Sequence, residues 1–286
     1  MQAFLITAYK DFDQLYELVT YLGENNKVFV HVDKSSREIT AEQIGMLNRI
    51  GGCTAISTYE ICWGSFTHVQ AILALIELAL KSGEITYMHL ITAQDLPVIS
   101  LDEIERRFDR ETHIYMDYIV QKDFTPAVKI RYQYYNWFVN RDVKKKWLWS
   151  LQYLTVLLQK LLFIKRKGIG PFSSIYKGLV YISMPRDAAA YVIDYCREEP
   201  SYLKSLKRCQ VPEEFFFQTL FMNSYFKERV IKRELRYMNW EKGDGSSPAF
   251  LDESDYEMLM KGDYVFARKF DREISQSLKE RIMRDI

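Results

Sequence analysis

Short runs of apolar residues alternate with helical patterns through the first 116 residues of the chain. The apolar runs have the length of buried strands and lie at residues 4–8, 27–32, 54–56, 87–92 and 114–116. Between them, apolar residues recur three or four positions apart, which predicts helices at residues 11–21, 40–50, 65–81 and 100–108. Strands that alternate with helices predict an α/β fold, a mainly parallel central sheet flanked by helices.

The second half of the chain has a less regular pattern. Its strongest feature is the apolar stretch at residues 144–167, which is flanked by lysines and arginines and interrupted by Gln152, Gln159 and Lys160. The rest predicts a strand at residues 179–183 and helices at residues 186–197, 214–226 and 273–286. No linker rich in proline, glycine or serine divides the chain, so we expect a single domain over residues 1–286.

The second predicted strand ends in an acidic residue, within the sequence HVDKSS at residues 31–36. In a parallel sheet, ligands bind at the carboxyl ends of the strands, where Asp33 and its neighbour His31 are expected to lie. A carboxylate there can accept hydrogen bonds from the ribose or base of a nucleotide. The alternative is an aspartate that only closes a turn, a common use of this residue.

The strand at residues 87–92 leads into AQDLP, which places Gln94 and Asp95 at the same edge. Many enzymes that use nucleotide sugars hold a divalent metal with two aspartates at such a place, but here there is one. The letters DFD at residues 11–13 open a predicted helix, which suits an N-cap. Trp63 and Gly64 precede another helix, where they could shape a pocket for the donor or acceptor. An equally good alternative is that Trp63 is packed in the core.

Two further segments carry charged residues in an apolar setting. In PEEFFFQTL at residues 212–220, Glu213 and Glu214 suit the first turn of a helix, and one of them could instead be a general base. In FARKF at residues 266–270, Arg268 and Lys269 could hold a diphosphate, or they could form a basic surface patch beside a core strand.

Charge and cysteine usage narrow the class of protein. The formal net charge of +1 gives no reason to expect nucleic acid as a partner. The four cysteines and four histidines lack the spacing of a metal site, and the cysteines do not suggest a disulfide framework. The N-terminus lacks the basic and long apolar regions of a signal peptide, which leads us to expect a cytoplasmic protein.

Eight segments, in the same order, resemble those of the core-2/I-branching glycosyltransferase family, which includes the peptide O-xylosyltransferases. They are HVDKSS (31–36), CWGSFTHVQAILALIELAL (62–80), YMHLITAQDLP (87–97), GLVYIS (178–183), VPEEFFFQTL (211–220), NW (239–240), SSP (246–248) and FARKF (266–270). Each segment alone is a weak signal, but their shared order makes the resemblance specific.

The resemblance implies a GT-A-like fold without a metal-binding DxD motif, a UDP-sugar donor and inversion at the anomeric carbon. The catalytic base of the family, the glutamate of a PxE motif, corresponds to Glu214. Its diphosphate-binding pair corresponds to Arg268 and Lys269, and its nucleotide-binding aspartate to Asp33. The animal branching enzymes carry a further arginine in the region where this chain has Ser247 and Pro248, as in the xylosyltransferase pattern.

We therefore expect a microbial, metal-independent transferase that needs no cofactor. It would move N-acetylglucosamine, xylose or another hexose from UDP to a hydroxyl of a glycan in the synthesis of a surface polysaccharide, and that glycan could be linked to a lipid. A binding protein for carbohydrates or nucleotide sugars, or a UDP-sugar hydrolase, is the alternative. For residues 144–167 we expect a helix at the inner surface of the plasma membrane, or else one packed on the domain or in a dimer interface.

Overall fold

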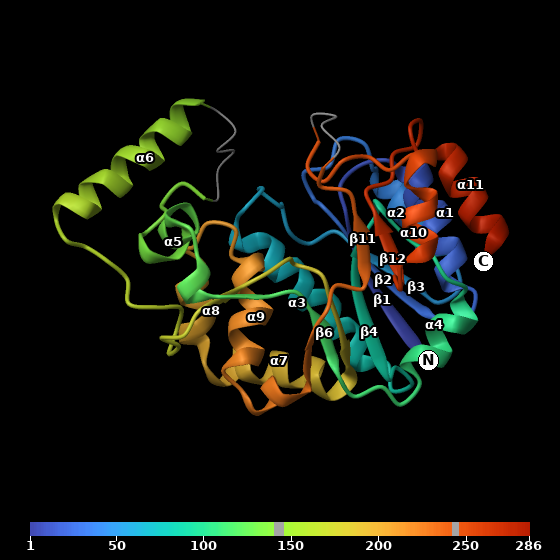
Figure 1. The fold of residues 1–286 in the computed structure, drawn as a ribbon, viewed down its shortest axis with the longest axis horizontal. Coiled ribbons are helices and arrows are strands. Elements are labelled where there is room, and N and C mark those ends of the chain that lie inside the picture. The colour runs from blue at the N-terminus through green and yellow to red at the C-terminus, as the bar shows by residue number, and fades with distance from the viewer. Residues whose placement is uncertain (140–145, 242–245) are drawn as a thin grey trace.

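The computed structural model describes residues 1–139, 146–241 and 246–286 of the chain (Figure 1). Residues 144 and 145, with which the apolar stretch begins, lie outside the described residues, as does the side chain of Trp149.

The main sheet has the strand order β10-β6-β9-β4-β1-β2-β3. Its neighbouring strands are parallel except around β9, which runs antiparallel to β4 and β6. The strands are β1 (Gln2–Ala8), β2 (Lys27–Val32), β3 (Cys53–Ile56), β4 (Tyr87–Thr92), β6 (Ile114–Met116), β9 (Ile182–Pro185) and β10 (Val230–Lys232). The predicted fold class, α/β with a mainly parallel central sheet flanked by helices, is confirmed.

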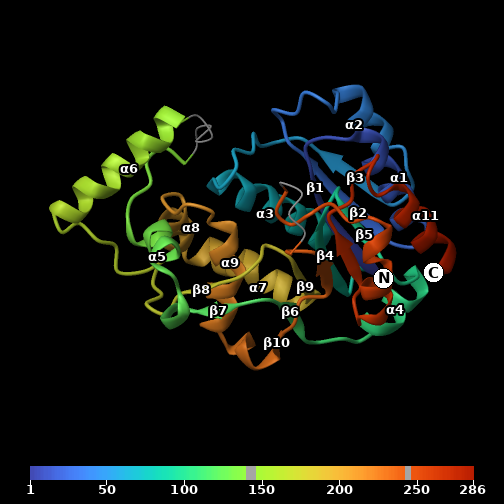
Figure 2. The same cartoon turned by 45° about the horizontal axis from the view of Figure 1, so that its top comes forward.

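Helices cover both faces of this sheet (Figure 1, Figure 2). One face packs against α3 (Phe66–Lys81), α7 (Arg186–Glu198), α8 (Pro200–Leu206) and α9 (Glu213–Met222). The other face packs against α1 (Phe12–Gly23), α2 (Ala41–Leu47), α4 (Leu101–Phe108), α10 (Tyr256–Lys261) and α11 (Gln276–Asp285). Each face has its own hydrophobic core, and side chains that alternate along a strand contribute to both. In β1, Leu5 packs in the core beside α3, and Phe4 and Ile6 pack in the core beside α1.

Polar N-cap residues pair with the free backbone N–H groups at the start of four helices. Asp11, Thr40, Ser65 and Ser100 each accept a hydrogen bond from a backbone N–H in the first turn of the helix that follows. The prediction that the DFD sequence serves as an N-cap is therefore confirmed for Asp11.

The bounds of several predicted elements differ from those expected. The strand expected at residues 179–183 is β9, which begins only at Ile182, because the preceding backbone bonds to α9: the amide of Gln218 donates to the carbonyl of Leu179 over 2.7 Å. The helix expected at residues 214–226 stops at Met222, and Ser224 caps a separate 3-10 turn at Tyr225–Arg229.

Strands of two or three residues, most of which the sequence pattern did not reveal, form two smaller sheets. β11 (Arg236–Met238), β12 (Phe266–Arg268) and β5 (Asp95–Pro97) lie in that order in one of them. β7 (Ile119–Val120) pairs with β8 (Tyr176–Lys177) in the other. The first of these matters for the site, because its antiparallel register sets Arg268 opposite Asp95.

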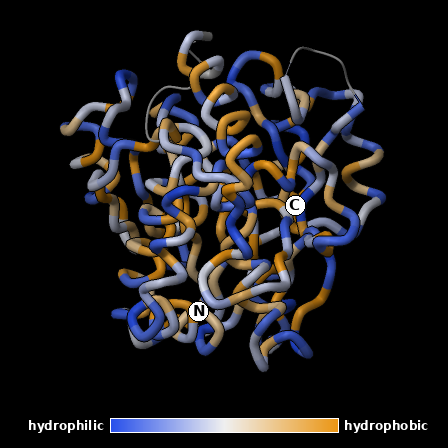
Figure 3. The backbone as a smooth tube through the Cα atoms, turned by 90° about the vertical axis from the view of Figure 1, so that its left-hand side faces the viewer, coloured by the Kyte–Doolittle hydropathy of each residue, from blue (hydrophilic) through white to orange (hydrophobic). Residues whose placement is uncertain are grey.

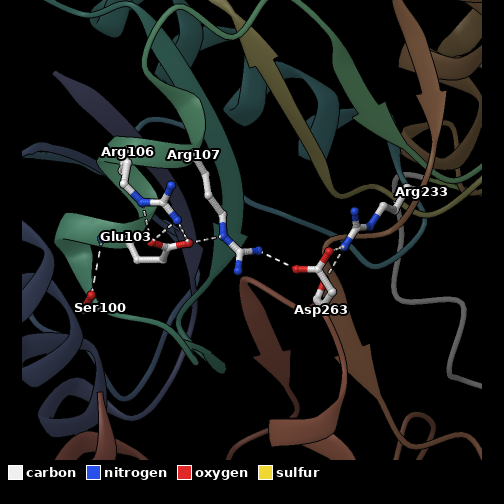
Figure 4. A network of polar contacts seen from close by, with 6 residues as sticks. All are labelled: Ser100, Glu103, Arg106, Arg107, Arg233 and Asp263. Carbon is white, nitrogen blue, oxygen red and sulfur yellow. Dashed lines mark hydrogen bonds and ion pairs between the residues drawn. The ribbon is translucent and has the colours of Figure 1, made fainter.

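A chain of surface ion pairs ties α4 to the loops around the three-stranded sheet (Figure 4). Glu103, whose backbone is capped by Ser100, binds Arg106 and Arg107, both over 2.7 Å. Arg107 also reaches Asp263 over 2.6 Å, and Asp263 in turn binds Arg233. Three segments far apart in the sequence are joined in this way.

α6 (Lys146–Leu161), with α5 (Pro126–Gln133) beneath it, stands apart from the main body in both ribbon views (Figure 1, Figure 2). Its glutamines face the protein: Gln152 donates to Asn136 over 2.7 Å, and Gln159 exchanges hydrogen bonds with the backbone of Tyr135. In Figure 3, which looks onto this side, hydrophobic residues are interspersed with hydrophilic ones along the chain. Within the described residues, no helix is both long and apolar enough to cross a bilayer.

Candidate active site

The carboxyl ends of the three central parallel strands meet at one edge of the main sheet. The register pairs Thr7 of β1 with His31 of β2 on one side and with Thr92 of β4 on the other. Asp33 and Asp95, which follow these strands, therefore lie at the same edge, where ligands of open α/β sheets bind.

His31 and Asp33 hold the loops at the end of β2. The His31 ring is fully buried, and its Nε2 accepts hydrogen bonds from the backbone N–H groups of Thr58 and Tyr59 over 3.3 and 3.1 Å. Burial lowers the pKa of His31 to about 4, so the ring is neutral at pH 7. Oδ1 of Asp33 accepts from Ile61 N over 3.0 Å and closes the turn at Ser35.

Asp33 therefore closes a turn, as the alternative interpretation of this aspartate predicts. It is also partly exposed at the edge where we expect a nucleotide to bind. His31, enclosed beneath the loop, is placed to support it rather than to touch a ligand directly.

Asp95 lies at the centre of a buried charge cluster. Its Oδ1 accepts from Nε of Arg236 over 2.7 Å, and its Oδ2 accepts from the hydroxyl of Thr92 over 2.8 Å. Arg268 approaches Oδ2 to 3.7 Å and donates to the same Thr92 hydroxyl. Asp95 therefore positions two arginines and has no oxygen free for direct contact with a ligand.

Tyr181 gives both guanidinium groups an aromatic surface. The carbon at the centre of the Arg236 guanidinium lies 3.7 Å from the centroid of the Tyr181 ring, and that of Arg268 lies 5.5 Å from it. One carboxylate between two arginines leaves the cluster with positive charge. Neither Arg236 nor Tyr181 was singled out from the sequence, although Tyr181 lies in the GLVYIS segment.

Lys269 extends this positive charge toward the loop at residues 246–251. Its ammonium group donates to Oγ of Ser246 over 3.0 Å and lies 4.3 Å from the centroid of the Phe250 ring. Ser247, named from the sequence, is exposed, and it is Ser246 that contacts the lysine. Gln94, also named from the sequence, is buried, and its carbonyl accepts from Phe270 N over 2.9 Å, so it fixes the strand that carries the cations.

Glu214 lies in the first turn of α9, and two cations hold it. Its Oε2 accepts a hydrogen bond from Arg131 over 2.9 Å and forms an ion pair with Lys177 over 2.8 Å. The side chain is 23% exposed. No hydrogen bond from the described residues reaches Oε1, which leaves one oxygen able to accept a proton. Arg131 and Lys177 lie in α5 and β8, and no motif in the sequence identifies them as partners of this glutamate.

Glu213, the other acidic residue of that turn, points into the protein. It is 7% exposed, its Oε1 lies 3.5 Å from Nδ1 of His68, and its Oε2 is buried without a partner among the described residues. Of the two glutamates, only Glu214 is open to a substrate in this arrangement.

Gly64 connects the start of α9 to the same edge of the sheet. Helix α3 follows β3 and precedes β4, so its first residues lie at the carboxyl ends of the strands. The Gly64 carbonyl accepts from Val211 N over 2.8 Å, and at a φ of 71° a side chain on Gly64 would press against Val211. Trp63 is 60% exposed beside this turn, so the alternative of a tryptophan packed in the core is wrong.

A single short segment joins the carboxylate to the cations. Lys177, which binds Glu214, and Tyr181, which lies against Arg236 and Arg268, are four residues apart and so at most about 14 Å apart along the chain. Within the segment, a side chain on Gly178 would collide with the carbonyl of Asp117, so glycine is needed there.

A second carboxyl group lies beside the arginine cluster. Burial raises the pKa of Glu234 to about 7 against the opposing charge of Arg236, and Asp117 and Asp95 raise it further. Oε1 of Glu234 is buried without a partner among the described residues. The residues described by the structure contain no group of three or more His, Cys, Asp or Glu side chains that could hold a metal.

Three comparisons show which known proteins this chain is similar to. The family model described as Core-2/I-Branching enzyme matches residues 2–259. The xylosyltransferase sqv-6 of Caenorhabditis briggsae is 21% identical over 231 residues, which make up 79% of this chain and 27% of that relative. A crystal structure of mouse xyloside xylosyltransferase 1 in its apo form aligns with 93% of this chain and 97% of its own, at 12% identity and a TM-score of 0.38.

Proposed function

The chain belongs to the core-2/I-branching enzyme family, and from this premise we propose that it is a glycosyltransferase. It would move a sugar from a UDP-sugar to a hydroxyl group of a glycan, with inversion at the anomeric carbon. The observation that supports this best is the pairing of a half-exposed glutamate with a cluster of fixed cations at the carboxyl edge of the sheet.

Glu214 is the general base of the proposed reaction. Its Oε1 takes the proton of the acceptor hydroxyl while the hydroxyl oxygen attacks the anomeric carbon. The bond from that carbon to the diphosphate oxygen breaks, and UDP leaves with the electron pair. Arg131 and Lys177 hold the other oxygen, Oε2, so that the base keeps one orientation.

Arg268 and Lys269 face the charge that builds on the leaving diphosphate. Arg268 is 14% exposed and Lys269 is partly buried, so these cations are fixed before the reaction rather than being moved into place. Because the described residues offer no set of metal ligands, we propose that these two side chains do what a metal does in related chemistry. We propose that Asp33, at the end of β2, holds the uridine or the ribose.

The donor we propose is UDP-N-acetylglucosamine or UDP-xylose. Ser247 and Pro248, next to the Ser246 that contacts Lys269, resemble the xylosyltransferase pattern, which keeps xylose alongside N-acetylglucosamine as the sugar to test. The chain spans about a quarter of the length of its xylosyltransferase relative, 27% of that protein.

We also propose that α6 contacts a membrane surface, which would suit a lipid-linked acceptor. Its outward side carries a continuous stripe of exposed apolar residues at helical spacing: Leu154, Leu157, Leu158, Leu161 and Leu162, followed by Phe163. Phe163 is 93% exposed, and Lys160 and Lys165 lie beside the stripe. An apolar stripe with neighbouring lysines is typical of helices that lie in the headgroup region.

The deciding experiment is a panel of UDP-sugars with the purified chain in the presence of EDTA. A donor that binds raises the melting temperature, and UDP release is then measured with and without glycan acceptors. Release that depends on an acceptor supports the transferase. Release without one would indicate a hydrolase, and binding without release a binding protein.

A further inference from the structure

A groove with a volume of about 1410 Å³ lies between α3, α8 and the segment that follows α6. We call it the basic groove, because six cationic residues line it: Lys165, Arg166, Lys167, Lys204, Lys207 and Arg208. Its single acidic lining residue, Glu77, is engaged by Arg197 over 3.0 Å.

The cations of the basic groove differ from those elsewhere on the surface. Many exposed arginines pair with carboxylates, as Arg107 and Arg233 do with Asp263 (Figure 4). Among the residues that the structure describes, no ion pair joins any of the six groove cations to an acidic side chain. In a chain of net charge +1, this concentrates unneutralised positive charge in one concave place.

Aromatic side chains add flat apolar surfaces to the same groove. Tyr135 and Trp137 are 39% and 49% exposed, and their rings lie nearly parallel, 9° apart, with centroids 6.3 Å from each other. Arg166 lies over the Tyr135 ring and donates to the carbonyl of Ser205 in α8, which fixes this wall of the groove. Exposed aromatic faces with polar groups around them suit the apolar faces of sugar rings.

Two residues that line the basic groove connect it to the candidate active site. Phe66, which lines it, is two residues after Gly64, the residue bonded to the turn that leads to Glu214. Tyr59, another lining residue, stacks on His31 at the end of β2. A saccharide lying in the groove could therefore present a terminal hydroxyl toward the proposed base.

We propose that the basic groove binds the acceptor, and that this acceptor is an anionic saccharide carrying carboxylate, sulfate or phosphate groups. The inference rests on the proposed transferase function. A concave site with aromatic walls fits a chain of sugars better than the flat surface of a membrane, which the apolar stripe of α6 fits instead.

The test measures binding of a hexagalacturonate and of neutral maltohexaose by calorimetry at about 50 mM and about 300 mM NaCl. We expect the wild type to bind the anionic probe more tightly, with an affinity that falls as salt rises. Lys204→Glu/Lys207→Glu should weaken that binding by roughly tenfold or more, because two attractive charges become repulsive. The control Lys122→Glu/Lys227→Glu changes two exposed lysines outside the groove and should bind as the wild type does.

Three further readouts separate the explanations. Equal affinity for the two saccharides, or unchanged binding in the groove variant, overturns the inference. Tighter binding of an oligothymidylate than of the hexagalacturonate also overturns it, because the groove would then prefer a nucleic acid. Loss of binding to phosphatidylglycerol vesicles in the groove variant, but not in the control variant, overturns it too, because the groove would then face a membrane. UDP-sugar binding, measured on the same samples, reports on the proposed transferase function and should be equal in all variants.

Discussion

Arg236 donates a hydrogen bond from Nε to Oδ1 of Asp95 over 2.7 Å, with both side chains almost completely withdrawn from solvent. The pair joins β11 to β5, two strands of the small sheet that lie on either side of β12. Because β12 carries Arg268, the buried pair fixes the place from which the proposed diphosphate-binding residues project.

Asp95→Ala should lower the free energy of unfolding by about 3–5 kcal/mol, because it leaves Arg236 buried without its partner charge. Urea unfolding measures the loss. The matched control is Asp13→Ala, which breaks an exposed ion pair with Arg272 and should cost less than about 1 kcal/mol. Equal effects of the two substitutions would show that the buried cluster does not stabilise the fold.

Glu214→Gln should lower turnover by roughly a hundredfold or more while leaving UDP-sugar binding intact, because the amide cannot take the acceptor proton. Steady-state kinetics with a fixed donor concentration provides the measurement. Glu213→Gln is the control, since that residue is buried and its carboxylate faces His68. Near-normal turnover of Glu214→Gln, with loss in Glu213→Gln, would move the base to Glu213.

The long strands and helices could be predicted from the sequence because their apolar residues repeat over many positions. Helix α3 and strand β4 were placed from such patterns, and Ser65 and Ser100 cap the expected helices. Strands such as β5 and β11, of three residues each, are too short for a periodicity to appear. They form through pairing with distant segments, which a local pattern does not record.

The residues of the candidate site likewise fall into those that the sequence predicts and those that it does not. Glu214, Arg268 and Lys269 lie in recognisable segments, and the structure brings their segments to one edge of the sheet. Arg236 and Arg131 are separated from Asp95 and Glu214 by 141 and 83 residues, so no spacing along the chain reveals these contacts. For the same reason, no local pattern predicts that other residues occupy both carboxylate oxygens of Asp95.

Leu157→Gln/Leu161→Gln should reduce binding to anionic vesicles in co-sedimentation, because it removes apolar surface from the exposed stripe of α6. The substitutions should leave UDP-sugar binding and the melting temperature nearly unchanged, since neither side chain is buried. The control Val156→Ala changes the buried side of the helix, where the side chain is 5% exposed. Failure of the wild type to bind vesicles at low salt would contradict the membrane contact of α6. A dimer interface would then be the next role to test for this helix.

Glu234→Gln should change how stability depends on pH. The folded-state pKa of Glu234 is raised from 4.5 to about 7, so its favourable contribution is complete below pH 4.5 and is lost as the pH rises to about 7. At about 1.4 kcal/mol per pKa unit, the wild type loses at most about 3.5 kcal/mol in this window. Chemical unfolding should find the variant equal to the wild type near pH 4.5 and more stable at pH 8. A constant difference between the two proteins across this range would contradict the assignment.

Lys269→Ala should lower turnover by roughly a hundredfold or more, because a fixed donor to the developing charge is worth about 2.7–4 kcal/mol in the transition state. Lys261→Ala, which removes an exposed lysine paired with Glu257, is the control and should behave as the wild type does. Arg268→Lys should also be impaired. A lysine ammonium cannot reproduce the planar guanidinium that meets Thr92, Asp95 and the Tyr181 ring together.

Turnover of the wild type should persist in excess EDTA if these cations carry the charge of the diphosphate. The measurement is UDP release with an acceptor present, before and after chelation, and then with added manganese. Loss of activity with EDTA and its return with manganese would refute the cation mechanism. Asp95 could then bind the metal only by giving up Arg236 or Thr92, so Asp33, whose carboxylate is partly exposed at the end of β2, would be the acidic residue to substitute first.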